Sequence, residues 1–143
     1  MKIPTMRTVA MPADTNPRGD IFGGWIMSQM DLAGGEVARR RAKGKVATVA
    51  VSKLQFHKPV YVGDYVSCFA DIVKVGTTSI TVHVETFVER DEAAMEKVTE
   101  GTFVFVAIDE NRRPRPLDAN ISVKPKAKTK KKKDWLSGPV SIG

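Results

Sequence analysis

The sequence has very little cysteine and no long apolar run. Cys68 is the only cysteine among 143 residues, which excludes an intramolecular disulfide and a cysteine-based metal site. No segment, the first twenty residues included, has the apolar length of a signal peptide or a transmembrane helix. We therefore expect a cytoplasmic protein without a membrane partner.

Histidine is also scarce. The two histidines, His57 and His83, are 26 positions apart, and no suitably spaced acidic group accompanies them. They form no recognisable ligand set, so we expect no metal site. Each histidine is interpreted as a packed or surface residue.

The net charge of +7 is concentrated near the C-terminus. Seven lysines and one aspartate lie between residues 124 and 134, so the rest of the chain is close to neutral. Such a segment lacks the apolar residues needed to pack, and its like charges repel one another. We expect one compact domain over residues 1–123 and a basic, disordered tail over residues 124–143. The tail is a solubilising appendage or an arm for a polyanion. Because no helix-turn-helix or similar element accompanies it, we expect no nucleic-acid partner.

Several stretches are rich in β-branched residues. The run Val46–Phe56 partly alternates between apolar and polar residues, which predicts a strand. Short turn-forming segments separate the later runs, so neighbouring strands should pair as antiparallel hairpins. The other predicted strands are Tyr65–Val75, Thr78–Arg90, Val98–Ile108 and a short one at Arg7–Met11.

One segment, from about Gly24 to Lys43, is long enough for a helix of at least four turns, and Gly44 provides a stop. A helix with four or five antiparallel strands predicts an α+β domain whose sheet wraps around the helix. At helical spacing, one apolar stripe should face the sheet. It consists of Ile26, Met27, Met30, Ala33, Gly34, Val37 and Ala38.

Other helix residues fall outside the centre of this stripe. Asp31 lies at its margin, so its carboxylate should be partly buried. Trp25 and Leu32 lie on the opposite side, where a single subunit would expose them, and we expect this face to contact another subunit. Gly34 and Gly35 each disfavour the helix by ~1 kcal/mol relative to alanine. Close packing is the expected reason for tolerating them.

The chain enters the helix through a polar segment from Asn16 that ends in two glycines. The first amides of a helix, here those of Gly23, Gly24 and Trp25, lack partners within it and lie at the positive end of its dipole. Two glycines also leave the backbone open to a carbonyl whose oxygen becomes negative during attack. The entry is therefore a candidate oxyanion site, or simply a flexible lead into the helix.

Asp31 lies about two turns further on and is the only carboxylate of the helix before Glu36. A carboxylate near an oxyanion site can deprotonate water or attack a carbonyl carbon itself. Taken alone, a helical aspartate is more often solvated or salt-bridged. Base and nucleophile both stay open for Asp31, since each role needs the same residue in the same place.

Two long stretches carry a resemblance to a known family. They are RTVAMPADTNPRGDIFGGWIMSQMDLAGG and KVATVAVSKLQFHKPVYVGDYVSCFADIVKVGTTSITVHVE. Over residues 5–118 the chain resembles the bacterial YciA-type acyl-CoA thioesterases of the hotdog superfamily; TNPxGxIFGGW, SQMD and KPVxVGD are specific in combination. The resemblance implies the hotdog fold, an antiparallel sheet around one long central helix. It implies hydrolysis of fatty acyl-CoA to free coenzyme A and a carboxylic acid, with no cofactor, because coenzyme A is part of the substrate.

The resemblance also implies a homo-oligomer. Its active unit would be a dimer whose two sheets join, with active sites shared between subunits, and three such dimers would form a hexamer. Asp31 matches the catalytic carboxylate of the family, Asn16 matches an asparagine implicated in catalysis, and Gly24 with its neighbours Gly23 and Trp25 matches the oxyanion site.

Further residues fall where such enzymes contact coenzyme A. They are Lys58 and the turn formed by Gly76, Thr77, Thr78 and Ser79. Lys58 is equally well interpreted as a surface charge, and Thr77 stands where relatives can have an arginine, which puts affinity for the nucleotide end in question. The lysines of the tail could add attraction for the phosphates.

Two other functions fit parts of the pattern. A non-catalytic hotdog module could bind acyl-CoA as a regulator, although an intact Asp31 disfavours it. A thioesterase acting on acyl carrier protein would share the thioester and the pantetheine arm. The absence of a histidine before the helix counts against a hotdog dehydratase. Acyl-chain length and regulation by nucleotide or coenzyme A are not determined by the sequence.

Overall fold

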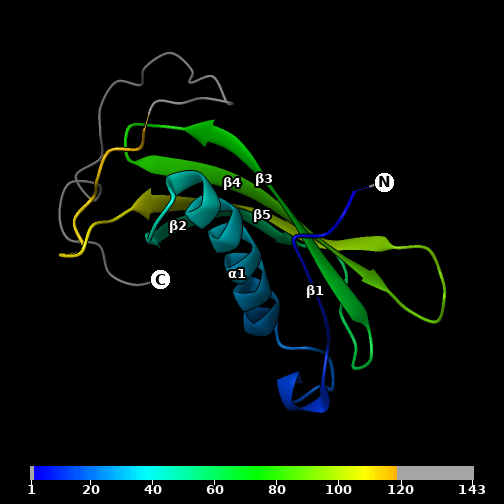
Figure 1. The fold of residues 1–143 in the computed structure, drawn as a ribbon. Helices are drawn as coiled ribbons and strands as arrows, with labels where there is room; N and C mark the ends of the chain where they lie inside the picture. The colour runs from blue at the N-terminus through cyan, green and yellow to red at the C-terminus, as the bar shows by residue number, and fades with distance from the viewer. Residues whose placement is uncertain (1, 119–143) are drawn as a thin grey trace.

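Five antiparallel strands and one long helix make up residues 2–118, the part of the chain that the computed structural model describes (Figure 1). The strands are β1 Met6–Val9, β2 Val46–Phe56, β3 Tyr65–Val75, β4 Ser79–Glu89 and β5 Glu96–Ala107. The helix α1 spans Gly23–Ala42, and a 3-10 turn, η1, spans Pro12–Asp14. Every predicted strand and the helix are confirmed, β2 and β3 with the predicted bounds.

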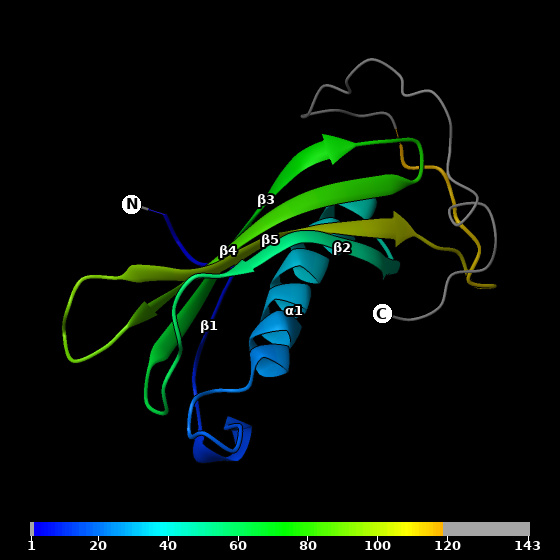
Figure 2. The same cartoon turned by 180° about the vertical axis from the view of Figure 1, so that it is seen from behind.

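The strands form one sheet in the order β1-β3-β4-β5-β2, and every pair is antiparallel. The chain reaches β2 from β1 through α1, so the helix leads from one edge strand to the other. It lies against the concave face of the sheet (Figure 1), and the view from behind shows β2 bordering β5 (Figure 2). This is the predicted α+β arrangement. Among the described residues, no helix has both the length and the apolarity to cross a membrane.

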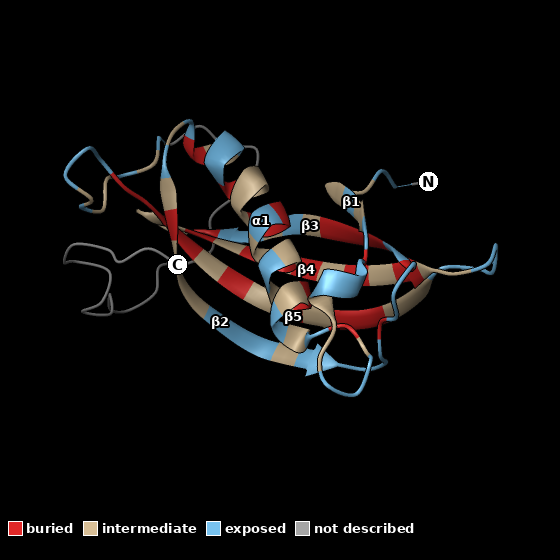
Figure 3. Cartoon of the chain, turned by 90° about the horizontal axis from the view of Figure 1, so that it is seen from below, coloured by how far each residue is buried: buried red, intermediate tan, exposed pale blue. Residues whose placement is uncertain are grey.

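The core lies between α1 and the sheet. β4 alternates along its whole length, with the even-numbered residues from Ile80 to Val88 buried and the odd-numbered ones partly exposed (Figure 3). Since successive side chains of a strand point to opposite faces, one face of β4 packs on the helix and the other forms the outer surface. The helix buries Ile26, Met30, Ala33, Gly34, Ala38 and Ala42 against it. Met27 and Val37, also placed in the stripe, are only partly buried.

Close packing explains Gly34 as expected. A Cβ atom there would lie 3.1 Å from ring carbons of Phe105, which is tighter than an ordinary contact. At Gly35 the nearest atom of the same ring would be 3.6 Å away, an ordinary contact distance. Gly44 also has a reason to be small, because a Cβ atom would lie 2.8 Å from Nη2 of Arg115, which donates to the carbonyl of Ala42 at the helix end.

The expected exposure of the second helix face is only half right. Leu32 is 59% exposed, as predicted. Trp25 is partly buried and packs against the core, so its predicted exposure is wrong. The reason is that η1 and the following loop fold back beside the first helical turn, where the Phe22 amide donates to the Asp14 carbonyl (2.8 Å). The basic segment predicted over residues 124–143 lies outside the described residues.

Candidate active site

Asp31 lines a groove between α1 and the start of β2. The groove has a volume of about 470 Å³, and its walls include Leu32, Gly35 and Glu36 of the helix. Asp31 is partly buried, as its place at the margin of the apolar stripe predicts. The hydroxyl of Thr48 donates a hydrogen bond to its Oδ1 atom (2.7 Å). One carboxylate oxygen is thus fixed, and the carboxylate borders an open groove.

Thr48 was not identified from the sequence. It stands in VATVAV, an apolar run in which it reads as an ordinary β-branched strand residue. Its one distinguishing signal is that it carries a hydroxyl near the start of β2, the first strand after the helix. The contact joins residues 17 positions apart, so it exists only because β2 folds back beside α1.

Asn16 holds the loop that leads into the helix. Its side-chain Oδ1 atom accepts hydrogen bonds from the backbone amides of Arg18 (2.8 Å) and Asp20 (3.2 Å). Its backbone amide donates to the Asp20 carbonyl (2.7 Å). This is the turn role that asparagine commonly fills. The participation of Asn16 in catalysis stays a prediction.

The helix entry presents fewer free amides than expected. The amide of Trp25 donates to the carbonyl of Phe22 (3.0 Å), so the prediction that it lacks a partner is wrong. Helix ends commonly tighten in this i to i−3 manner. The amides of Gly23 and Gly24 are left as the candidate oxyanion donors. Gly24 and Trp25 line a second groove, of about 430 Å³, with Phe22 and Ser28.

The two halves of the candidate site lie at different heights along α1. Gly24 and Asp31 are seven residues apart, which places them on nearly the same side of α1 but roughly 10 Å apart along its axis. A reacting carbonyl needs its oxygen about 3 Å from the donors and its carbon about 3 Å from the attacking atom. Along one helix, this separation exceeds the roughly 7 Å that direct attack by the carboxylate on an amide-bound carbonyl allows, whereas a bridging water adds about 3 Å to that span.

Lys58 and the turn predicted to contact coenzyme A also lie far from each other. The amide of Lys58 bonds to the carbonyl of Val98, whereas Ser79 pairs with Val106. Eight residues of β5 separate these points, or roughly 27 Å. Within one subunit, Lys58 and the turn therefore cannot contact the same nucleotide.

Each of these two places has local partners. The Lys58 ammonium bonds to Glu96 (2.5 Å) and thereby holds the pKa of that carboxyl below its usual value. In the turn, the amide of Gly76 donates to the carbonyl of Ser79 (2.8 Å). The carbonyls of Thr77 and Thr78 accept from the amides of Leu117 and Ala107, which ties the turn to the chain after β5. The role of both places in binding stays a prediction.

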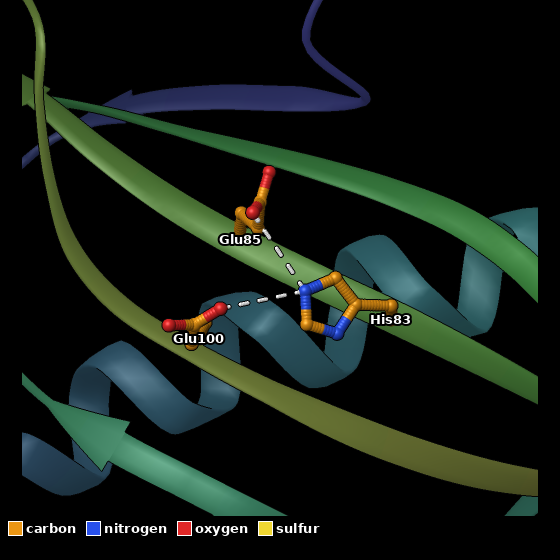
Figure 4. A group of neighbouring side chains, drawn as sticks. All are labelled: His83, Glu85 and Glu100. Carbon is orange, nitrogen blue, oxygen red and sulfur yellow. Dashed lines mark ion pairs between the residues drawn. The ribbon is translucent and has the colours of Figure 1, made fainter.

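A cluster that the sequence spacing did not indicate lies on the outer face of the sheet (Figure 4). Nε2 of His83 lies 3.7 Å from Glu85 and 3.6 Å from Glu100, which gives a donor set of the kind that holds divalent metals. The ammonium of Lys97, however, lies 3.0 Å from Glu85 and 3.3 Å from Glu100 and supplies a positive charge there. These bonds raise the pKa of Lys97, the bond to Glu85 most strongly. The cluster is therefore an ion-pair network centred on Lys97.

The two histidines are remote from the Asp31 groove. His83 belongs to the outer-face cluster, and Nε2 of His57 lies 2.9 Å from the second oxygen of Glu100. That contact is the main reason why the pKa of Glu100 is lowered. Both histidines are thus surface residues with acidic neighbours, one of the two roles that the sequence suggested.

Comparison with known proteins places the chain in a family. The family model described as thioesterase superfamily matches residues 18–95. The acyl-CoA thioester hydrolase YciA of Salmonella typhimurium is 51% identical over 118 residues, covering 78% of this chain and 87% of that protein.

Solved structures agree with this assignment. The hexameric thioesterase y2039 of Yersinia pestis has a TM-score of 0.80 at 47% identity, covering 82% of this chain and 97% of its own. Cj0915 of Campylobacter jejuni, a hexameric hotdog fold thioesterase, has a TM-score of 0.77 at 40% identity, covering 80% and 90%. The resemblance drawn from the sequence motifs is confirmed. This chain belongs to the thioesterase superfamily, as a hotdog-fold member of the YciA type.

Proposed function

We propose that the protein hydrolyses acyl-CoA thioesters to free coenzyme A and a carboxylic acid. The observation that carries the proposal is Asp31, oriented by Thr48 in an open groove beside the central helix of a YciA-type fold. A carboxylate held in this way is suited to general-base or nucleophilic attack on a thioester. A module that only binds acyl-CoA would not require a carboxylate oriented in this way.

In the base route, Asp31 takes a proton from a water molecule, whose oxygen attacks the thioester carbonyl carbon. The carbonyl oxygen becomes negative and is stabilised by helix-entry amides. Cleavage of the carbon–sulfur bond releases the coenzyme A thiolate, which takes the proton from Asp31, and the carboxylic acid remains. In the nucleophile route, the Asp31 carboxylate attacks the carbonyl carbon and the carbon–sulfur bond breaks, which releases the coenzyme A thiolate and leaves an anhydride. Water then hydrolyses the anhydride to the carboxylic acid and the Asp31 carboxylate, and the released proton passes to the thiolate. Thr48 holds the carboxylate in both routes.

The distance between the two halves of the site supports a catalytic unit of two subunits. Because Asp31 lies roughly 10 Å along α1 from Gly24, we expect it to act with the Gly23 and Gly24 amides of a second subunit. An isologous dimer with antiparallel helices would bring the two helix halves together twice.

The edge strand β2 is a suitable place for such a dimer to join. It has 11 residues, pairs with β5 on one side and lies at the border of the sheet. Exposed apolar side chains lie on it and on the neighbouring helix face: Phe22, Leu32, Val51 and Phe56. The Yersinia pestis and Campylobacter jejuni thioesterases are hexameric. We therefore expect a homo-oligomer, built as a trimer of such dimers.

Charge along the Asp31 groove supports an anionic substrate. The walls of the groove carry Arg39, Lys45 and Arg112 and the carboxylates of Asp31 and Glu36, of which Glu36 accepts from Arg39 (3.0 Å). The phosphates of coenzyme A would be attracted to this rim, and the attraction would weaken with salt. In a dimer, Lys58 or the Gly76–Ser79 turn of a second subunit would add to this attraction. The predicted coenzyme A contacts would then come from two subunits. The chemistry proposed needs no cofactor, and the cytoplasmic location stays a prediction.

The test is release of free thiol from short-, medium- and long-chain acyl-CoAs by the wild type and by Asp31→Asn. We expect turnover by the wild type and a loss of at least about 100-fold in the variant, with the oligomer intact. Asp31→Asn keeps the shape and the contact to Thr48 but removes the charge. If neither protein released thiol while the wild type bound the same ligands, the proposal would be replaced by an acyl-CoA-binding module. Comparable turnover by both would remove Asp31 from the mechanism.

A further inference from the structure

An ion pair between a partly exposed arginine and a buried carboxylate joins the end of β4 to the loop of residues 57–64. Asp64 is 1% exposed, and Arg90 donates to both of its carboxylate oxygens, from Nε and from Nη2, at 2.7 Å each. The guanidinium also lies over the ring of Tyr61, 4.9 Å from its centroid. The bidentate pair is the stronger form of an arginine–carboxylate contact, and the bonds to Asp64 raise the pKa of Arg90. Arg90 is therefore a fixed cation at this loop.

The same carboxylate closes the turn in which it stands. The amide of Tyr61 donates to Oδ2 of Asp64 (2.9 Å), and the amide of Asp64 donates to the carbonyl of Tyr61 (3.0 Å). Gly63 between them has φ +93°, a conformation that favours glycine. Loss of the guanidinium would leave a buried carboxylate short of its main partners, which destabilises this turn first.

The turn of residues 61–64 and the residue before it are hydrogen-bonded to the chain that leads into α1. The amide of Ala10 donates to the carbonyl of Asp64 (3.0 Å), and the amide of Gly63 donates to the carbonyl of Ala10 (2.9 Å). The amide of Ile21 donates to the carbonyl of Val60 (2.8 Å). Ile21 lies two residues before Gly23, so contacts lead from Arg90 through Asp64 and the loop to the residue that precedes the helix N-cap, Phe22.

We propose that Arg90 is a positioning residue for hydrolysis. Through Asp64 and the loop of residues 57–64 it fixes the helix entry, and with it the amides of Gly23 and Gly24 that receive the negative oxygen. This inference rests on the proposed function. Because such amides bind the transition state more strongly than the substrate, displacing them lowers kcat and leaves KM nearly unchanged.

The test compares Arg90→Met with a matched control, Arg7→Met. Arg7 also has one carboxylate partner, Glu89 at 2.9 Å, and lies over a tyrosine ring, Tyr65 at 5.2 Å. Both side chains of its ion pair are well exposed, and Arg7 bonds to Glu89 rather than to a residue of the loop of residues 57–64. Measured well below the unfolding temperature, we expect Arg90→Met to lose on the order of 10-fold in kcat with little change in KM, and Arg7→Met to match the wild type.

Arg90→Lys is a second variant, which keeps the charge but not the bidentate geometry. Arg90→Lys should recover part of the lost kcat. If Arg90→Met does not fold, Arg90→Lys should still fold and can be measured instead. Wild-type kcat in both Arg90 variants, or a rise in KM at constant kcat, overturns the proposal.

Amide hydrogen exchange gives a readout that does not depend on activity. Peptides covering residues 10–24 should exchange faster in the Arg90 variants than in Arg7→Met, since the entry loses its support. Unchanged exchange there overturns the proposal even if kcat falls. If the wild type hydrolysed no acyl-CoA, the proposed function would fail, and faster exchange would still show that Arg90 holds the entry.

Discussion

At the scale of single residues, the hydroxyl of Thr48 decides how Asp31 is presented. The Thr48 hydroxyl fixes one oxygen of the carboxylate, and the Asp31 backbone is fixed in the helix. The carboxylate therefore has few rotamers available. A hydrogen bond to a charged group contributes about 1.5–3 kcal/mol. The contribution of Thr48 to turnover should therefore be measurable in isolation.

We expect Thr48→Val to lower kcat on the order of 10-fold without unfolding the protein, because valine keeps the shape and removes the donor. Thr81→Val is the control, since Thr81 is a partly buried strand threonine on the outer face of β4. Steady-state kinetics on one acyl-CoA would compare the two. Equal kinetics for wild type and Thr48→Val would mean that the hydrogen bond does not orient Asp31 for reaction.

Glu100 gives a prediction for pH. Its pKa is lowered, mainly by the contact with His57, so its ionised form is more stable in the folded protein than in the unfolded chain. The resulting stability is present above the pKa of glutamate in the unfolded chain, about 4.3, and is lost as pH falls through the lower folded value.

Glu100→Gln should therefore lower the unfolding temperature at pH 7, and its difference from the wild type should shrink as pH falls below about 4. Thermal unfolding between pH 3 and pH 8 measures this. Glu110→Gln, at an exposed turn position, is the control and should show no such trend. A difference that stays constant with pH would contradict the assignment.

At the scale of the helix, two adjacent glycines differ in how much room their surroundings leave for a side chain. Alanine gains about 1 kcal/mol over glycine in a helix interior, but overpacking a core costs about 1–3 kcal/mol. At Gly34 the new methyl would press on Phe105, which is 1% exposed and cannot move away easily. At Gly35 the same methyl would meet that ring at an ordinary distance.

We expect Gly34→Ala to destabilise the protein by about 1 kcal/mol and Gly35→Ala to stabilise it by up to about 1 kcal/mol. Urea unfolding at one fixed protein concentration compares them, since an oligomer's stability depends on concentration. The two substitutions control for each other. Stabilisation by both would show that the Phe105 ring yields more readily than its packing suggests.

At the scale of the whole molecule, the separation of Asp31 from Gly24 determines how many chains make a site. If each site takes Asp31 from one subunit and the amides from another, two inactive variants can complement each other. A mixed dimer of Asp31→Asn with Gly24→Val would contain one site with both substitutions and one with neither.

Hexamers that carry two different tags should regain turnover, up to about half of the wild-type rate if every dimer in them is mixed, although each variant alone is inactive. Thiol release by the doubly purified species is the measurement. Tagged wild-type subunits, mixed and purified in the same way, are the control. No recovery would show that each site is built within one subunit, which would require the helix entry to move towards Asp31.

The sequence by itself determined the elements of this protein and the antiparallel hairpins of β3 with β4 and of β4 with β5. The expectation that neighbouring strands pair is wrong for β2 and β3, because β2 pairs with β5 at the other edge of the sheet. Strand and helix patterns are local, so β2 and β3 could be placed with the bounds observed and α1 within one residue at each end. The stripe that ends at Ala38 already contained most of the helix core, and the marginal position of Asp31 already indicated partial burial. The motifs around Gly24 and Asp31 were enough to identify the family.

Tertiary structure alone decided what each candidate residue contacts. The bond from Thr48 to Asp31 and the ion pair of Arg90 with Asp64 join segments 17 and 26 positions apart, and no local pattern encodes such contacts. The separation of Gly24 and Asp31, in contrast, follows from helix geometry alone: residues two turns apart share a helix face but lie roughly 10 Å apart along the axis. Trp25 was misplaced because helical spacing cannot show that a preceding loop folds back over it.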